Sequence, residues 1–259
     1  MAITLRSRRE IDLMRKAGIV VARVLSKLQE MVEPGVTTAE LDRAALRMTA
    51  EAGACALFKG VKSPYARQPF PGAICTSINE QVVHGIPSDD TRLKNGDILS
   101  IDFGVRLDGY CSDAAVTVAV GEISQAKQRL LDVTKEVLDI AIQMCAAKIR
   151  WSQVAGRMQY HAESAGFSVV RDFVGHGIGR KMHEEPKVPN FVSPELLAND
   201  IVLTEGMVMA VEPMVNAGSS DVQTLENGWT VVTKDGKYSA HFEHTVAIVG
   251  NGCEVLTVD

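Results

Sequence analysis

The sequence lacks the features that mark membrane and secreted proteins. No segment approaches the roughly 18 uninterrupted apolar residues of a membrane-spanning helix. The first residues, MAITLRSRREIDLMRKAG, place charges where a signal peptide needs its apolar run. We therefore expect a cytoplasmic protein with no membrane partner.

Excess charge and paired cysteines are also missing. The net charge of -5 provides no basic footprint for nucleic acid, so we expect no nucleic-acid binding. The five cysteines are odd in number, widely scattered and include no CxxC pair. This pattern argues against a disulfide framework and against structural zinc, and it indicates the reduced thiols of a cytosolic chain.

What the sequence does contain is the composition and periodicity of a folded chain. Of its 259 residues, 46% are hydrophobic and 23% are charged, as in ordinary globular proteins. Apolar spacing and capping residues predict helices over residues 7–31, 37–52, 124–147 and 152–165. Ser7 and Glu10 have the spacing of a capping box at the first of these helices.

Strands follow each pair of helices. Residues 73–86 predict one strand pair with a turn near Asn79, and a hairpin follows over about 98–120. Further strands are predicted within 173–179, 207–213, 228–234 and 242–249. The order helix, helix, strands therefore occurs twice. It predicts a single α/β domain of α+β organisation over residues 1–259, with similar halves at about 1–122 and 123–259.

The stretch SIDFGVRLDGYCSDAAV, residues 100–116, predicts a hairpin with acidic side chains. Asp108-Gly109 suits a two-residue turn, which places Gly104 opposite Asp113 and Asp102 diagonal to it on the same face. A bulge at the turn would change this register. Two carboxylates on an apolar hairpin repel each other and lose solvation unless a cation lies between them. Taken alone, the pattern also suits one aspartate that faces solvent.

Four further polar residues stand in apolar or glycine-rich stretches. They are His176 in GHGIG, His183 in MHEEP, Glu212 in MAVEPMV and Glu243 in HFEHTVAIV. Each has an ordinary explanation as a packed histidine, a loop histidine or a strand-end glutamate. Together with the two aspartates, the glutamates and His176 form a donor set that suits hard or borderline divalent ions. Four carboxylates carry a charge that two such ions would neutralise.

The motifs SINEQVVHGIP, SIDFG, YCSDAA, GHGIGRKMHEEP, VEP and HFEHTVAI resemble those of type I methionine aminopeptidases, over nearly the whole chain. The resemblance implies the pita-bread fold, in which two pseudo-symmetric halves of antiparallel strands and flanking helices surround a dinuclear metal site. It implies that Asp102 chelates one ion, that Asp113 and Glu243 bridge both, and that His176 and Glu212 complete the other. Co, Mn, Fe or Zn all suit these ligands, so the metal stays open.

The same resemblance implies roles for residues that the pattern alone leaves as surface histidines or core residues. His84 and His183 match histidines that contact substrate and the tetrahedral intermediate, and Glu212 matches a proton shuttle. A metal-bridged hydroxide would attack the carbonyl. Phe70, Cys75 and Trp229 match the methionine side-chain pocket. No role is expected for His161, His241 or His244, and strand alternation should turn His244 away from the site.

The implied activity is removal of the initiator methionine from nascent chains, with a preference for a small second residue. An X-Pro-cleaving peptidase of the same fold and a non-catalytic binding module are the alternatives. The former usually carries an additional N-terminal domain, and the latter should have lost ligands. We expect a monomer whose partners are nascent N-termini, with ribosome association left open and no docking through the zinc-binding extension of the eukaryotic type. Met182, where an aromatic is frequent, and the long 58–72 loop depart from the family pattern.

Overall fold

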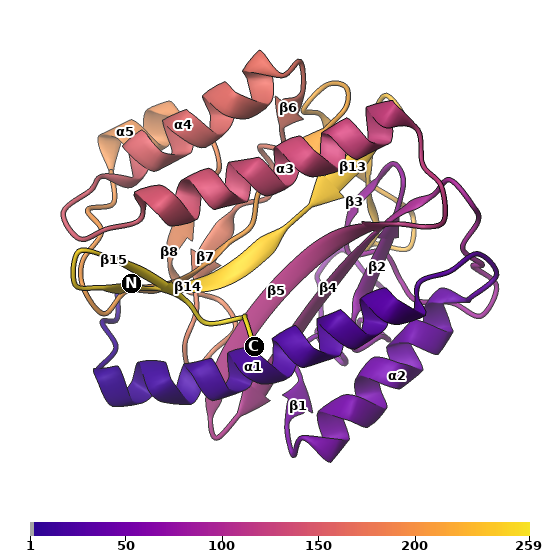
Figure 1. The fold of residues 1–259 in the computed structure, drawn as a ribbon, viewed down its shortest axis with the longest axis horizontal. Helices are drawn as coiled ribbons and strands as arrows, with labels where there is room; N and C mark the ends of the chain where they lie inside the picture. The colour runs from indigo at the N-terminus through magenta and orange to yellow at the C-terminus, as the bar shows by residue number, and fades with distance from the viewer. Residues whose placement is uncertain (1–2) are drawn as a thin grey trace.

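The computed structural model describes residues 3–259 (Figure 1). Two helices, α1 (Arg8–Met31) and α2 (Thr38–Glu51), begin the fold. Each starts at a capping box, formed by Ser7 with Glu10 and by Thr37 with Glu40. Such caps satisfy backbone N–H groups that have no partner within the helix, and each contributes about 1 kcal/mol. The first two predicted helices are confirmed.

The second half begins with another helix pair, α3 (Gln125–Met144) and α4 (Trp151–Ser164), and also contains the short helix α5 (Pro194–Ala198). Ser124 caps α3, whose end comes three residues before the predicted one. Trp151, at the start of α4, is fully buried, and its indole Nε1 donates to the Pro189 carbonyl oxygen at 2.7 Å. Within residues 3–259 no helix has both the length and the apolar character to cross a membrane.

A nine-stranded antiparallel sheet carries strands from both halves. Its main order is β1-β4-β5-β14-β9-β7-β8, with β2 added beside β4 and β15 beside β14. These strands are β1 (Cys55–Ala56), β2 (Cys75–Ile78), β4 (Ile98–Leu107), β5 (Tyr110–Ala119), β7 (Gly175–Gly177), β8 (Glu184–Val188), β9 (Val208–Val211), β14 (Glu243–Val249) and β15 (Gly252–Val255). In Figure 1, β5 and β14 run side by side through the middle, where the two halves meet.

Two small antiparallel sheets complete the fold. One has the order β13-β10-β6, the other β11-β12-β3. Their strands are β3 (Gln81–Val83), β6 (Ser168–Val169), β10 (Met214–Asn216), β11 (Val222–Thr224), β12 (Val231–Thr233) and β13 (Ser239–His241).

The two strands predicted over 73–86 are present, but the prediction that they pair with each other is wrong. The turn is where we expected it, with Asn79 at a φ of 55°, but β2 pairs with β4 and β3 pairs with β12. The Gln81 side chain accepts from the Ile78 backbone N–H at 3.1 Å, a bond that a regular hairpin would give to the backbone. The chain therefore passes from one sheet to another within this turn.

The acidic hairpin has the predicted register. Gly104 lies opposite Asp113, and Asp102 lies opposite Ala115. Asp108 and Gly109 form the turn with φ values of 50° and 82°, the left-handed pair that a tight two-residue turn requires. The register places both carboxylates on one face of the β4–β5 ribbon.

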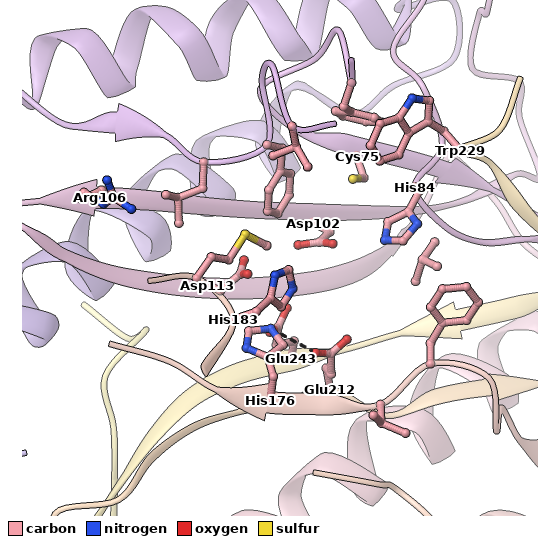
Figure 2. Close-up of a pocket in the computed structure, with 18 residues that line it drawn as sticks. Cys75, His84, Asp102, Arg106, Asp113, His176, His183, Glu212, Trp229 and Glu243 are labelled. Carbon is pink, nitrogen blue, oxygen red and sulfur yellow. Dashed lines mark ion pairs between the residues drawn. The ribbon is translucent and has the colours of Figure 1, made fainter. Parts of the chain in front are cut away.

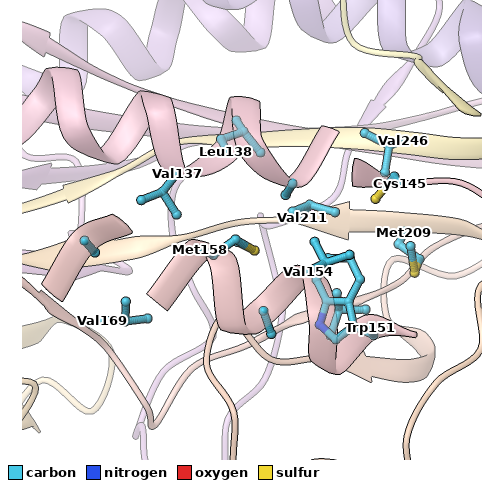
Figure 3. Close-up of a cluster of buried hydrophobic side chains, with 14 of the residues drawn as sticks. Val137, Leu138, Cys145, Trp151, Val154, Met158, Val169, Met209, Val211 and Val246 are labelled. Atoms are coloured by element: carbon cyan, nitrogen blue, oxygen red, sulfur yellow. The ribbon is translucent and has the colours of Figure 1, made fainter. Parts of the chain in front are cut away.

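Two hydrophobic cores support the sheet. α1 and α2 pack against β4 and β5, while α3 and α4 pack against the strands of the second half. Figure 3 shows the second core, where Val154 and Met158 of α4 face Val211 of β9 and Leu138 of α3. Each half thus buries one face of its strands under two helices.

Helix α1 also meets the end of the chain. A Cβ on Gly18 would overlap the backbone carbonyl of Leu256, whereas a Cβ on Gly156 of α4 would lie 3.4 Å from the Val192 side chain. Both glycines are inside helices, but only Gly18 lies against another backbone. Its missing side chain therefore allows the close packing of α1 on the C-terminal segment.

This difference predicts opposite effects for the same substitution. Gly156→Ala should be neutral or stabilise the fold by up to about 1 kcal/mol, because alanine is the better helix former. Gly18→Ala should destabilise the fold by about 1–3 kcal/mol, because the backbone of Leu256 must move. Urea unfolding of both variants measures the two effects. Equal free energies of unfolding would contradict the close-approach argument.

Candidate metal centre

One cleft between the two halves contains every residue that we predicted for the site. Its volume is about 420 Å³. The ten predicted residues among those that line it are Phe70, Cys75, His84, Asp102, Asp113, His176, His183, Glu212, Trp229 and Glu243. Figure 2 shows the carboxylates and two imidazoles of this set pointing toward one another from strands of both halves.

The centre of the cleft is a compact group of three donors. Ligand atoms of Asp113, His176 and Glu243 all lie within 4.8 Å of one another. Asp102 and Glu212 line the same cleft but do not belong to this tight set. Asp113 has room because its cross-strand neighbour is Gly104, where a Cβ would lie only 2.9 Å from the Asp113 Oδ1 atom.

Glycines also set the position of His176. A Cβ on Gly175 would overlap the Ala210 carbonyl oxygen, and one on Gly177 would overlap that of Glu185. Strand β7 therefore lies unusually close to its neighbours. The Nδ1–H of His176 donates to the Gly177 carbonyl oxygen at 3.0 Å, which leaves the lone pair of Nε2 directed into the cleft.

That free nitrogen faces another acceptor. The His176 Nε2 atom lies 3.5 Å from the Glu212 Oε1 atom. A neutral imidazole nitrogen and a carboxylate oxygen both offer lone pairs, so they repel unless a proton or a cation lies between them. The pair is therefore arranged for a shared positive ligand.

His241 is a site neighbour that our sequence reasoning missed. We expected no role for it, but the structure places its fully buried Nε2 atom 3.8 Å from the Glu212 Oε2 atom, without a hydrogen-bond partner among the described residues. The sequence could have predicted this position, because His241 is two residues before Glu243 and such residues lie on the same face of an extended chain. His244 turns away as expected, toward the Thr257 hydroxyl at 2.8 Å.

Two threonines join the halves beside the metal ligands. β5 and β14 share only the residue pairs Glu243–Ala115 and His244–Ala114. The Thr245 hydroxyl accepts from the Asp113 N–H at 3.0 Å and donates to the Asp113 carbonyl oxygen at 2.8 Å. Thr117 does the same for His241, with both distances at 2.8 Å. The hydrogen bonds of these hydroxyls take the place of backbone hydrogen bonds between the two strands, on either side of Glu243.

The two substrate-contact candidates lie on opposite sides of the centre. His84 has a left-handed backbone, with a φ of 59°, and its ring meets the ring edges of Phe173 and Trp229 at centroid distances of 5.6 and 6.4 Å. His183 lies against His176, with ring centroids 4.3 Å apart, and is itself exposed. Both imidazoles therefore border the space around the carboxylates.

A buried arginine from the N-terminal segment supports the His183 loop. Arg6 forms an ion pair with Glu184, the residue after His183, and its guanidinium packs against Gly179. The other oxygen of Glu184 accepts from the Lys181 N–H at 3.0 Å. This contact fixes the loop between β7 and β8.

An apolar cluster closes one end of the cleft. Phe70 and Trp229 meet edge to face at 5.3 Å, and Phe58, Cys75 and Met182 pack with them. The long 58–72 loop forms part of this wall, because the Trp229 Nε1 atom donates to the Gln68 carbonyl oxygen at 2.9 Å. Met182 therefore takes a place in the apolar wall that an aromatic side chain would also fill.

Burial changes the protonation of the whole centre. It raises the pKa of Asp113 to about 7, and it raises the pKa values of Asp102, Glu212 and Glu243 well above their usual range, with mutual repulsion adding to the effect. Burial, and then the neighbouring His183, lower the pKa of His176 and of His84 to about 4. Both imidazoles are therefore neutral at pH 7.

The donor set suits divalent metal ions. One carboxylate oxygen each of Asp102, Asp113 and Glu243 is buried without a hydrogen-bond partner among the described residues. Orphaned acceptors of this kind are costly unless a cation binds them. Carboxylates with one neutral imidazole provide the ligands that Mn, Fe, Co or Zn accept.

The metal-free protein should become less stable as pH rises. The buried carboxyls keep their protons to a higher pH in the folded state than in the unfolded chain, so the folded state loses stability as pH rises through the folded pKa, which is about 7 for Asp113. The buried histidines His84, His176 and His241 have lowered pKa values and act in the opposite direction, but only below about pH 6.5, where the unfolded chain still protonates them. Chelator-treated protein should therefore unfold at a lower urea concentration at pH 8.0 than at pH 7.0. Saturating Mn²⁺ should reverse this trend, since it binds the deprotonated ligands. The same trend with and without Mn²⁺ would contradict the assignment.

Known proteins match this chain over almost its full length. Residues 12–249 match the model of metallopeptidase family M24. A methionine aminopeptidase of Clostridium perfringens is 50% identical over 256 residues, which are 99% of either chain. The methionine aminopeptidase of Escherichia coli is 41% identical and covers all of this chain and 95% of its own.

Solved structures agree with the fold. The methionine aminopeptidase of Thermotoga maritima superposes with a TM-score of 0.93 at 41% identity, covering 100% of both chains. An Xaa-Pro dipeptidase from Bacillus anthracis has a TM-score of 0.76 at 22% identity, and this chain covers 62% of its length. The second likeness concerns the fold alone, and it confirms the predicted pita-bread architecture. Because it matches these proteins in sequence, length and fold, the chain belongs to metallopeptidase family M24, among the methionine aminopeptidases.

Proposed function

We propose that this chain removes the N-terminal methionine from polypeptides whose second residue is small. The observation that carries the proposal is the position of the Asp113–His176–Glu243 group next to a closed apolar pocket. A metal centre suits peptide hydrolysis, and a pocket that ends in a wall admits only a chain terminus. The names of the full-length relatives support the same activity.

Two divalent ions, in our proposal, bind among the five ligand candidates. Asp113, His176 and Glu243 would hold the ions from the compact donor group, and Asp102 and Glu212, which line the same cleft, would complete the ligands. When bound, the ions supply an activated water and polarise the scissile carbonyl. The donor set accepts several metals, so loading the protein with each of them in turn identifies the one that supports activity.

The chain's own groups then handle protons and orientation. Glu212 has a raised pKa, so its carboxyl is able to accept a proton near neutral pH and to release it to the leaving amine. His84 and His183 are neutral donors that border the reacting carbonyl, and they stabilise the negative charge that develops on it. The ring edges of Phe173 and Trp229 hold His84 in place.

The apolar end of the cleft provides selectivity for the first residue. Phe70, Cys75 and Trp229 enclose a space in which a thioether chain contacts aromatic edges and a thiol. Sulfur–aromatic contacts of this kind are favourable. Met182 adds a flexible side chain to the same wall, so the pocket adjusts to its ligand.

The remaining parts of the proposal concern the setting of the reaction. We propose that residues 1–259 act as one catalytic unit, as a monomer, on nascent chains in the cytosol. None of the five cysteines forms a disulfide bond in the structure, which agrees with that compartment. Contact with the ribosome is a separate question that the nascent-chain substrate raises.

The two alternatives have less support. X-Pro peptidases share the fold, but the matched Xaa-Pro dipeptidase is only 22% identical, whereas the two methionine aminopeptidases are 50% and 41% identical over almost the whole chain. A non-catalytic binding module has no need for buried carboxylates without partners, and three such oxygens lie in this cleft.

A peptide series tests the activity. Met-Ala-Ser and Met-Gly-Ser should lose their methionine with a kcat/KM at least about 10²-fold above that for Met-Lys-Ser and Met-Leu-Ser, because a bulky second side chain displaces the scissile bond from its reactive position. Purified protein loaded with Mn²⁺ or Co²⁺ and analysed by chromatography of the products gives these values. Efficient cleavage of Ala-Pro-Ser in place of Met-Ala-Ser would favour the X-Pro activity.

A variant of His84 distinguishes a role in substrate contact from a role in metal binding. His84→Ala should lower kcat by about 10²–10⁴-fold, the range of a positioned acid–base or donor group. Metal content, measured by atomic emission after gel filtration, should remain that of the wild-type protein, because His84 is not one of the five ligand candidates and its ring packs against Phe173 and Trp229. Parallel loss of metal and activity would identify His84 as a ligand instead.

A further inference from the structure

The cleft has a recognisable mouth. Of the residues that line it, only Val61, Arg106 and His183 are exposed, whereas the others are buried or half-buried. The Phe70–Cys75–Trp229 end is closed by packing. A polypeptide whose N-terminal residue occupies the closed end must therefore leave past these three exposed residues.

Arg106 stands at this mouth because of strand alternation. Asp102, Gly104 and Arg106 of β4 share one face, so the guanidinium projects on the side of the metal ligands. In Figure 2, Arg106 lies at the opposite end of the cleft from Cys75 and Trp229. Four residues of extended strand place it about 13 Å from Asp102.

The charge of Arg106 is not neutralised within the described part of the chain. No carboxylate of residues 3–259 forms an ion pair with it. Its cross-strand neighbour Cys111 is a neutral thiol at pH 7, because burial raises the pKa of that group. The nearest acid along its own strand is Asp108, in the exposed turn.

Three exposed lysines are sequence neighbours of residues that line the cleft. Lys62 follows Val61, Lys59 follows Phe58, and Lys181 precedes Met182. The charge of Lys59 also acts on the half-buried Asp42, so Lys62 and Lys181 are the two that add to Arg106. The 58–72 loop contains no acidic residue. Glu184 could oppose these charges, but it is already paired with Arg6. The mouth is thus cationic in a chain whose net charge is -5.

The spacing relates this charge to particular substrate positions. An extended peptide advances about 3.3–3.6 Å per residue. With the first residue held beside Asp102, the side chains of the third to fifth residues come to the distance of Arg106. The second residue is too close to the metal ligands to reach it.

We propose that the cationic mouth, formed by Arg106 with Lys62 and Lys181, selects substrates with acidic side chains at the third to fifth positions. The proposal rests on the aminopeptidase function and adds a preference that the methionine pocket does not determine. Exposed ion pairs are weak and are screened by salt, so the effect is modest at each position and depends on ionic strength. It acts on KM rather than on kcat, because the contacts form equally in the ground state and the transition state.

Three matched peptides test this preference, Met-Ala-Ser-Glu-Glu-Ala, Met-Ala-Ser-Gln-Gln-Ala and Met-Ala-Ser-Lys-Lys-Ala, each with an amidated C-terminus. At low salt the acidic peptide should have a kcat/KM about 3–10-fold above that of the basic one, with the neutral one between them. Addition of about 0.5 M NaCl should remove most of the difference.

Variants assign the preference to the mouth. Arg106→Gln and Lys62→Gln should each reduce the ratio between acidic and basic peptides, and Arg106→Glu should reverse it. Arg157→Gln, which removes an exposed cation of α4 outside the cleft, is the matched control and should keep the wild-type ratio. The three side chains changed in these four variants are exposed, and urea unfolding verifies that each variant folds.

The outcomes are distinguishable from failure of the proposed function. Equal cleavage of the acidic and basic peptides by the wild-type protein, or an unchanged ratio in Arg106→Glu, would overturn the inference while methionine removal stands. Absence of cleavage of all three peptides and of Met-Ala-Ser would overturn the aminopeptidase proposal itself.

Discussion

Repulsion among four carboxylates in one buried cleft is the constraint that explains most of the site. Asp102, Asp113, Glu212 and Glu243 have no arginine or lysine partner among the described residues, and burial raises the pKa of each. A fold that served only stability would not place them together, because each desolvated charge costs several kcal/mol. The burial of apolar side chains in the two helix-covered cores supplies the free energy that compensates this cost, and bound cations offset the repulsion that remains.

The junction of the two halves explains how this strained centre keeps its geometry. β5 and β14 share only two residue pairs, so the backbone ladder alone is a short connection. Thr117 and Thr245 extend it, each with a hydroxyl that both accepts from and donates to the opposite backbone. Because these bonds flank Glu243, the distance between ligands of the two halves is fixed before any metal binds. Preorganisation of this kind favours tight and selective metal binding.

Local signals made much of this predictable from the sequence, and long-range contacts account for the rest. The capping boxes of α1 and α2 and the Asp108-Gly109 turn are determined by neighbouring residues, so the helices and the acidic hairpin register were predicted correctly. The partners of β2 and β3 depend on strands far along the chain, and that prediction failed. The contact of His241 with Glu212 and the cationic mouth likewise exist only after distant segments meet. The ligand assignments relied on family resemblance more than on spacing.

The packing of α1 against Leu256 has a consequence for how the protein is made. The first helix of the chain lies against nearly its last residues, and Arg6 is paired with Glu184, which lies 178 positions later. Contacts of such large sequence separation form slowly, because a long loop must close before they contribute. During synthesis, α1 and α2 emerge well before their neighbours in the second half exist. The centre is therefore completed only after Glu243, the last residue of the compact donor group, has been synthesised and β14 has paired with β5.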